Sequence, residues 1–244
     1  MDGTGAGTFT SAITGLAATT TYYVRAYATN ISATSYGDEF LFKTFTGTVP
    51  DVDGNVYNTM TIGTQTWMAE NLKTTKYRNG DLIGTTTPAT LDITGESAPK
   101  YQWAYDGNES NVATYGRLYT WYAVTDTRNV CPTGWHVPND SEWTILATFL
   151  GGDGIAGSKL KETGTTHFTT SNTGATNETG FTALPGGMRG DNVFAMKGED
   201  AGFWSSTEQS TAAAYERWVT NKSGDFFKGG YGKWAGIGIR CLKD

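Results

Sequence analysis

The strongest constraint on the fold is a capped helix near the middle of the chain. In CPTGWHVPNDSEWTILATFLGG, residues 131–152, Pro138 ends an extended run, and Asn139, Asp140 or Ser141 can cap a helix. Apolar residues then recur at helical spacing until two glycines end the run. We predict a helix whose buried face consists of Trp143, Leu146, Ala147 and Leu150.

Elsewhere the chain is typical of short strands and turns. Glycine fills 32 of 244 positions, and charged residues make up only 17%. NVYNTMTIG and QTWMAENL predict a hairpin, residues 79–114 predict loops, and YGRLYTWYAV, residues 115–124, predicts a short helix. Strand-like segments follow the central helix: GFTALPGGMR, NVFAMKG, GFWSST, AYERWVT and GIGIRCLK.

The first 44 residues predict three strands: TFTSAIT, TYYVRAYATN and DEFLFKT. This region resembles the C-terminal half of a fibronectin type III domain, with Leu16 and Tyr22 in the places of that family's leucine and corner tyrosine. The earlier strands of such a sandwich are absent, which would leave an apolar face uncovered. The following domain or another chain could cover this face, but we favour a sequence that begins inside a longer parent.

Charge and hydropathy exclude two classes of partner. A net charge of −6 without a basic cluster argues against nucleic acid. No apolar run reaches the roughly 20 residues that span a bilayer. The N-terminus also lacks the features of a signal peptide, so we expect a mature piece of a longer protein.

The chain has two cysteines, Cys131 and Cys241. A metal site would have at most two cysteine ligands, and His136 and His167 lack the paired spacing of a zinc motif. A disulfide is the simpler use of the two thiols, and two separate buried thiols are the alternative. We expect no metal and no cofactor.

Six blocks between residues 49 and 244 resemble, in order and spacing, the Fibrobacter succinogenes major paralogous domain. The resemblance implies an α+β, C-type lectin-like fold with two helices, a twisted antiparallel sheet and neighbouring ends, after a partial β-sandwich. We accordingly expect fibronectin-like strands at 1–45, a linker at 46–50 and the lectin-like domain at 51–244. The blocks are DVDGNVYNTMTIGTQTWMAENL, YGRLYTWYAV, CPTGWHVPNDSEWTIL, TNETGFTALPGGMR, FWSST and GIGIRCLKD.

The same resemblance bears on the cysteines and on location. If the last strand passes the base of the central helix, Cys241 can meet Cys131 and close a loop of about 110 residues, worth roughly 4 to 5 kcal/mol. Such a bridge favours an oxidising compartment. The family occurs in secreted or surface proteins of Bacteroidetes and related bacteria, so we expect an exported, extracellular or cell-surface protein, including one associated with bacteriophage.

Residues 207–236 are predicted to form an exposed, irregular excursion that binds a ligand. They are rich in Tyr, Trp, Phe, Asn, Ser and Gly, the composition of adaptable binding surfaces. Diversity-generating retroelements mutate this region in related lectin-fold proteins, so the resemblance suggests that it could be diversified. The candidate ligand-binding residues are Tyr215, Glu216, Trp218, Asn221, Asp225, Phe227, Lys228, Tyr231, Lys233 and Trp234.

The aromatic side chains outside and inside this excursion are expected to differ in exposure. We predict that the tryptophans on regular elements are core, and that some of those between residues 215 and 234 are exposed, Phe226 being a further candidate. For Trp218, alternation into the sheet is the competing interpretation. The expected core tryptophans are Trp67, Trp121, Trp135, Trp143 and Trp204.

Catalysis and calcium binding are weakly supported. DVDGN alternates Asp51, Asp53 and Asn55, but an EF-hand starting there would need glycine at Val56 and glutamate at Ile62, so a turn is favoured. The segments VPND and FWSST are not the calcium-dependent sugar motifs of C-type lectins.

The formylglycine-generating enzyme has a related fold and uses paired cysteines, but here the bridge would occupy both. His136 is expected to be packed, and His167 has no evident partner. The acidic pair Glu199 and Asp200 is expected in a solvated turn.

The sequence therefore predicts a non-enzymatic module that binds a protein or a carbohydrate. The competing class is a structural spacer or a self-assembling filament or surface subunit, with possible self-association through the incomplete N-terminal sandwich. No nucleic acid and no membrane insertion are expected.

Overall fold

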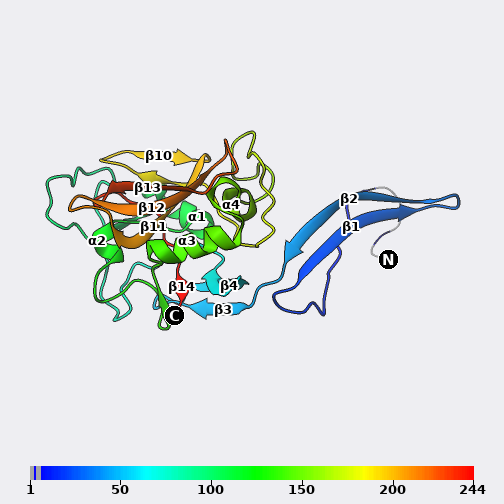
Figure 1. Ribbon diagram of the computed structural model, residues 1–244, viewed down its shortest axis with the longest axis horizontal. Helices are drawn as coiled ribbons and strands as arrows, with labels where there is room; N and C mark the ends of the chain where they lie inside the picture. The colour runs from blue at the N-terminus through cyan, green and yellow to red at the C-terminus, as the bar shows by residue number, and fades with distance from the viewer. Residues whose placement is uncertain (1–2, 4–6) are drawn as a thin grey trace.

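The computed structural model describes residue 3 and residues 7–244, and shows a mixed α/β protein made mostly of strands. A two-stranded hairpin, β1 (Thr21–Thr29) and β2 (Thr34–Lys43), projects from a rounded body that holds the other elements (Figure 1). Lys43 Nζ donates to the carbonyl oxygen of Thr61 at 2.7 Å, where the hairpin meets the body.

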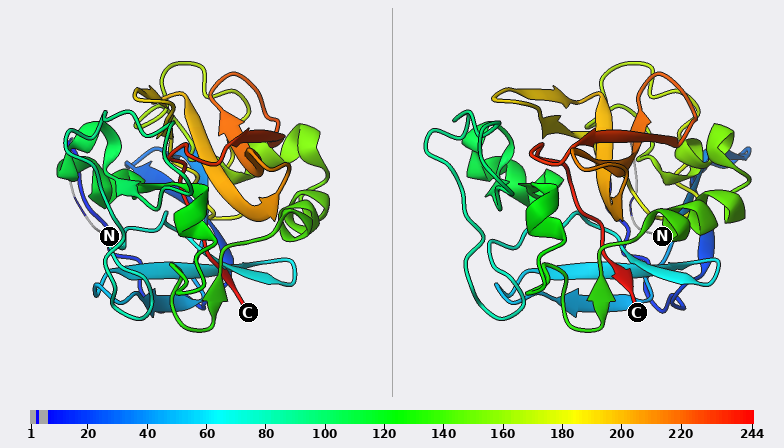
Figure 2. Two further views of the ribbon diagram at one scale, coloured as in Figure 1. Left: turned by 90° about the vertical axis from the view of Figure 1, so that its left-hand side faces the viewer. Right: turned by 60° about the vertical axis from the view of Figure 1, so that its left-hand side comes forward.

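The body contains two five-stranded sheets that lie one above the other (Figure 2). The lower sheet has the order β3-β4-β5-β14-β8, and the upper sheet β10-β9-β11-β12-β13. Pairing is antiparallel except between β9 and β11. The strands of the body are β3 (Gly47–Pro50), β4 (Val56–Ile62), β5 (Gln65–Met68), β6 (Gln102–Trp103), β7 (Leu118–Tyr119), β8 (Trp135–His136), β9 (Gly186–Arg189), β10 (Phe194–Lys197), β11 (Asp200–Glu208), β12 (Ala213–Thr220), β13 (Phe227–Gly232) and β14 (Leu242–Lys243).

The predicted central helix is present as α3 (Asp140–Phe149). The Asn139 side chain accepts from the backbone N–H of Glu142, whose carboxylate accepts from the backbone N–H of Asn139, forming a capping box. The Trp143 ring lies 4.5 Å from that of Trp67, so α3 is anchored to the lower sheet. The other helices are η1 (Tyr105–Gly107), η2 (Glu109–Asn111), α1 (Val112–Tyr115), α2 (Trp121–Val124) and α4 (Asp153–Leu160).

The tryptophans predicted to be core are all buried. They divide between two large apolar clusters, one around α2 and the disulfide and the other between α3, α4 and both sheets. A third, smaller cluster lies beneath the loops of residues 79–114, which are mostly irregular as predicted. The five residues are Trp67, Trp121, Trp135, Trp143 and Trp204.

The last strand-like segment of the chain joins the two sheets. Ile237 and Ile239 are fully buried, and backbone bridges tie residues 236–238 to Tyr119, Arg189 and Phe203. Only β14 is a regular strand in this segment; Leu242 pairs with Trp67 of β5 and with His136 of β8. The end of the domain therefore lies beside its first hairpin, as expected.

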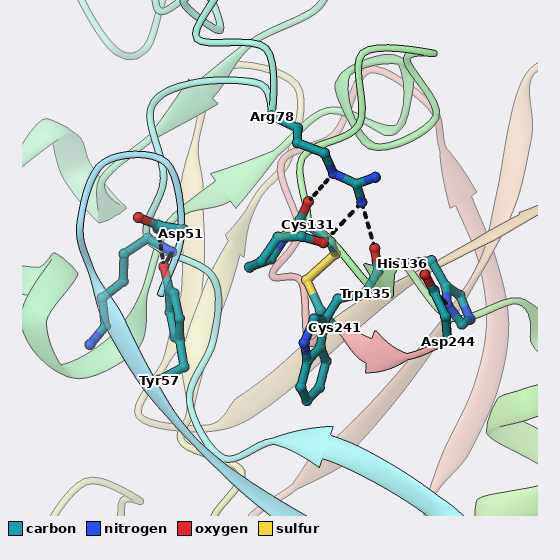
Figure 3. The surroundings of a disulfide bond; sticks show 10 residues. Asp51, Tyr57, Arg78, Cys131, Trp135, His136, Cys241 and Asp244 are labelled. Atoms are coloured by element: carbon teal, nitrogen blue, oxygen red, sulfur yellow. Dashed lines mark hydrogen bonds and ion pairs between the residues drawn. A yellow bond between two sulfur atoms is a disulfide. The ribbon is translucent and has the colours of Figure 1, made fainter. Parts of the chain in front are cut away.

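The expected disulfide between Cys131 and Cys241 is present, with Cα atoms 6.0 Å apart. The Arg78 guanidinium donates to the carbonyl oxygens of Cys131, Pro132 and Trp135, and so holds the loop that carries the bridge (Figure 3). The disulfide thus joins the loop before the central helix to the residues before the last strand.

His136 lies near this bridge and contacts two carboxylates. Its Nδ1 lies 2.6 Å from Asp244 Oδ1, and Figure 3 shows these two side chains next to each other. Its Nε2 lies 2.9 Å from Glu142 Oε1. Burial opposes its charge, but the hydrogen bonds to Asp244 and Glu142 outweigh burial and raise the pKa of His136. His136 is half-buried and held between two carboxylates, so the expected packing role stays a prediction.

Three sequence predictions for the N-terminal half are wrong. Residues 8–14 form no strand, and the expected linker includes β3, which pairs with β4. The helix predicted over residues 115–124 is broken because Gly116 has a φ of +74° and packs against Asn71, so that α1, β7 and α2 replace it. The hydroxyl of Tyr22 does accept from nearby backbone, the N–H of Ala17, at 2.9 Å.

Candidate functional site

The predicted binding segment is more regular than its sequence suggests. Residues 207–236 are not an irregular excursion, because β12, β13 and the end of β11 occupy most of them as strands of the upper sheet. Trp218 pairs with Gly202 on β11 and with Phe227 on β13. Side chains therefore alternate between two faces of this sheet.

One face of β12 and β13 packs toward α3 and α4. Arg217 Nη1 donates to Asp153 Oδ1 at 2.8 Å, and Lys228 Nζ donates to Asp140 Oδ2 at 2.7 Å. The Lys228 ammonium also lies 4.4 Å from the centre of the Tyr215 ring. Two candidate residues, Tyr215 and Lys228, are thus engaged in holding the sheet against the helices.

The opposite face carries aromatic rings, and we call it the aromatic face. By strand register it includes Glu216 and Trp218 on β12 and Phe227 and Tyr231 on β13. The rings of Trp218 and Phe227 stack with centres 5.1 Å apart, and the Tyr231 ring lies 6.0 Å from that of Trp234. All of these side chains are half-buried, so each retains some access to solvent. On the same face Trp204 and Ala214 are fully buried, and Tyr231 packs against the core cluster that contains them.

Two glycines leave space on the aromatic face. A Cβ at Gly202 would lie 3.7 Å from Glu216 Oε2, and a Cβ at Gly229 would lie 2.8 Å from the Trp218 ring. The carboxylate of Glu216 therefore leans over β11, while the Trp218 ring extends over β13. Larger residues at either glycine would fill the space that these two side chains use.

Glu216 is electrostatically unusual. Burial, and then the charge of Asp200, raise the pKa of Glu216 to about 7. Burial also raises the pKa of Asp200. Within the part of the chain that the structure describes, the Glu216 carboxylate has no hydrogen-bond or ion-pair partner.

Comparison with known proteins gives one match. The sequence profile of the Fibrobacter succinogenes major domain (Fib_succ_major) matches residues 60–243. The chain belongs to this family. No curated protein and no solved structure matches it.

Several candidate residues of the major domain are structural rather than exposed. Lys233 is only 4% exposed; its ammonium contacts Glu208 Oε1 at 2.8 Å and lies 4.7 Å from the centre of the Trp121 ring. Asn221 is buried and donates to Thr169 Oγ1 at 2.7 Å. These side chains hold loops at the ends of the sheet.

Three further residues of the segment are also less exposed than residues of a surface loop would be. The backbone N–H of Asp225 donates to Ser223 Oγ at 3.3 Å, and its carbonyl packs against α4. Phe226 is fully buried. Trp234 is half-buried and packs against two of the core clusters. The accessible part of the predicted segment therefore narrows to the aromatic face.

Lys161 is a structural residue of the major domain that the sequence does not reveal. It is fully buried, and its ammonium donates to the carbonyl oxygens of Thr173, Thr220 and Ser223 at 2.7 to 2.9 Å. Burial lowers its pKa to about 8. The residue fixes the turn between β12 and β13, but a single lysine after a helix carries no distinguishing sequence signal.

The acidic segment at residues 51–55 forms a turn, as predicted. Asp51 Oδ1 accepts from the backbone N–H groups of Asp53 and Asn55, and Asp53 accepts from Thr75. Their carboxylates are thus used for local hydrogen bonds. No cluster of three or more potential metal ligands occurs among residue 3 and residues 7–244, and none of their helices is long and apolar enough to cross a bilayer.

Two other sequence expectations need correction. His167 does have a partner, because its Nδ1 lies 2.9 Å from both carboxylate oxygens of Glu162. Glu199 and Asp200 are not simply a solvated turn: Asp200 begins β11 and is partly buried, and Glu199 Oε2 lies 3.0 Å from Lys222 Nζ.

Proposed function

We propose that this chain is an exported, non-enzymatic module with a C-type lectin-like fold that binds a protein or glycan through residues 207–236. In this proposal the β1–β2 hairpin is part of a fibronectin type III sandwich. The mixed fold, the single disulfide and the family membership support this assignment. The disulfide supports an oxidising location, because it would be reduced in most cytosols.

The observation that carries the proposal is the gathering of half-buried rings on one sheet face. Trp218, Phe227 and Tyr231 come from two adjacent strands, and pairing within the upper sheet holds their backbone. Aromatic side chains on a rigid support provide large contact area for a sugar ring or a protein pocket at little cost in conformational entropy. A diversified version of this module would vary these accessible positions and preserve buried ones such as Phe226.

The test is a binding screen with matched variants. Wild-type protein would be applied to arrays of bacterial and host glycans and of extracellular proteins, and each hit compared with Trp218→Ala/Phe227→Ala. We expect binding to fall at least tenfold in this variant, because aromatic anchors dominate such interfaces. Tyr23→Ala, on the distant hairpin, is the control. Equal loss in both variants, or unaltered binding in the double variant, would contradict the proposal.

Self-association is a second candidate function, favoured by the hairpin. Tyr23 and Phe40 are 65% and 68% exposed, and β1 and β2 pair only with each other among the described strands. An uncovered two-stranded sheet of this kind can pair with another copy, as a spacer or filament subunit would. Sedimentation velocity over a hundredfold concentration range tests it: assembly that Tyr23→Lys/Phe40→Lys abolishes would favour the structural role.

A further inference from the structure

The aromatic face contains a carboxylate that has no cationic partner among the described residues. Glu216 projects from the central strand of a three-stranded segment, between Trp218 on its own strand and Tyr231 diagonally across on β13. On the same face its directly paired residue on β11 is the fully buried Trp204, and Gly202 and Gly229 lie beside it, with the Trp218 ring over Gly229. A half-buried acid that has no cationic partner is costly to keep charged in the free protein.

The charges around Glu216 do not supply that counter-charge. Asp200 on β11 raises its pKa, and Glu216 together with Asp191, in the turn between β9 and β10, raises that of Tyr231 after burial. The positive charge of Lys222 acts on Asp200, and its ammonium contacts Glu199 Oε2. The surroundings of Glu216 are therefore net negative.

The nearby cations of the same strands are directed to the other side of the sheet. Arg217 and Lys228 alternate with Glu216 and Phe227, and both contact carboxylates at α3 and α4. The charge of Glu216 is thus not compensated by these cations, and a molecule outside the described chain could compensate it.

We infer that Glu216 is the anchor for a cationic group, the ammonium of a lysine or the guanidinium of an arginine on a protein partner. This inference rests on the proposed binding function and specifies its ligand class. Charge complementarity favours a cation because a neutral sugar would desolvate the carboxylate further without compensating its charge. The rings of Trp218 and Tyr231 add a surface on which a cation is also stabilised.

The inference predicts a proton-linked affinity. A cation binds the ionised form of Glu216, whose pKa is raised to about 7 by burial and Asp200, so binding must release a proton at lower pH. Affinity should therefore rise about tenfold from pH 6 to pH 8 as the carboxylate ionises. Titration of Asp200 acts in the same direction, whereas Lys222 stays charged and Tyr231 neutral over this range.

The experiment uses defined small probes and the full chain. N-acetyl-lysine methylamide and N-acetyl-arginine methylamide would be titrated while the Trp218 indole and the Gly202 and Gly229 amide signals are followed by NMR. Methyl glucoside and methyl galactoside are the neutral probes. Glu216→Gln keeps the shape and removes the charge; Glu39→Gln, exposed on β2, is the control with the same change in net charge.

We expect at least one cationic probe to shift these signals, with binding weakened tenfold or more by Glu216→Gln and unchanged by Glu39→Gln. Equal binding to wild type and Glu216→Gln, or shifts caused by the glycosides alone, would overturn the inference. The second result would leave the proposed function intact, since a neutral ligand would still bind there. If nothing binds in either the arrays or the titrations, the inference and the proposed function are both overturned.

Discussion

Two charged residues of this protein, Lys161 and Glu216, differ in how well their charge is compensated. Lys161 donates to three backbone carbonyls, so its desolvation is largely compensated. Glu216 has no such partner within the described chain. A compensated charge stabilises the fold, whereas an uncompensated one costs stability and is a candidate for binding. The two residues therefore predict mutational effects of opposite sign.

Glu216→Gln should stabilise the protein at pH 8 and leave its stability unchanged at pH 4. The folded-state pKa of about 7 exceeds the model-peptide value of 4.5, so the proton stabilises the fold below pH 4.5 and its benefit is lost as pH rises through 7. Glutamine removes the charge, and the gain at pH 8 should reach about 1 to 3 kcal/mol. Urea unfolding at the two pH values measures it; equal effects at both would show that shape, not charge, is responsible.

Lys161→Met should destabilise the protein by about 3 kcal/mol or more. The change removes the donor for the carbonyl oxygens of Thr173, Thr220 and Ser223 and leaves these polar groups without their ammonium partner. Lys159→Met is the control, because the Lys159 side chain is partly exposed and its ammonium forms an ion pair with the exposed Glu178. That surface pair should be worth less than about 1 kcal/mol in thermal unfolding. Similar losses in the two variants would refute the assigned role of Lys161.

At the scale of elements, α4 is positioned by close backbone contact. A Cβ at Gly157 would lie 2.0 Å from the carbonyl oxygen of Asp225, so the helix can approach the loop before β13 only because this residue is glycine. Gly154 lies on the same helix, where a Cβ would come no closer than 3.8 Å to its nearest neighbour. Substitutions at these two positions therefore distinguish an effect of packing from an effect of helix propensity.

Gly157→Ala should destabilise the protein by at least about 2 kcal/mol, because the new methyl group would push α4 away from Asp225. Gly154→Ala should be neutral or stabilising by up to about 1 kcal/mol, since alanine has the higher helix propensity. Circular dichroism during thermal unfolding compares the two. A tolerated Gly157→Ala would mean that the loop shifts easily and that α4 is not fixed there.

At the scale of the whole molecule, the two sheets and the central helix are held by the last residues of the chain. Residues 236–241 contact both sheets, and the Arg240 guanidinium donates to Asn71 Oδ1 and to the carbonyl oxygen of Ala69 while lying over the Phe181 ring. The disulfide then closes the loop from Cys131 to Cys241. Loss of this bridge should affect global rather than local stability.

Cys131→Ala/Cys241→Ala should lower the free energy of unfolding by about 4 to 5 kcal/mol, chiefly because the unfolded chain gains the freedom of a loop of about 110 residues. Guanidinium unfolding measures the change, and wild-type protein kept reduced with dithiothreitol should show a similar midpoint. If oxidised and reduced wild type unfold at the same denaturant concentration, the bridge has no such role.

Much of the fold could be predicted because its signals are local. The α3 helix follows from its cap and apolar spacing, the hairpin of β4 and β5 from its alternation, and the turn at Asp51 from its side-chain hydrogen bonds. The helix expected over residues 115–124 failed because Gly116 packs against Asn71, a residue distant in sequence. Local pattern cannot anticipate such a contact.

The candidate site was only partly predictable for the same reason. Composition pointed to residues 207–236, but it could not show that they form β12 and β13, or that Lys233 is buried while Trp218 keeps access to solvent. Which face a strand residue occupies depends on what packs against the sheet.

The amino-acid sequence alone determined the family, the positions of the central helix and hairpin, and the aromatic core, because these depend on spacing between near neighbours. Only the tertiary structure decided which charged residues are compensated by partners. Burial and partners are set by residues far apart in the chain: Lys161 meets three carbonyls, whereas Glu216 lies beside Trp204 and two glycines and meets no counter-charge among the described residues.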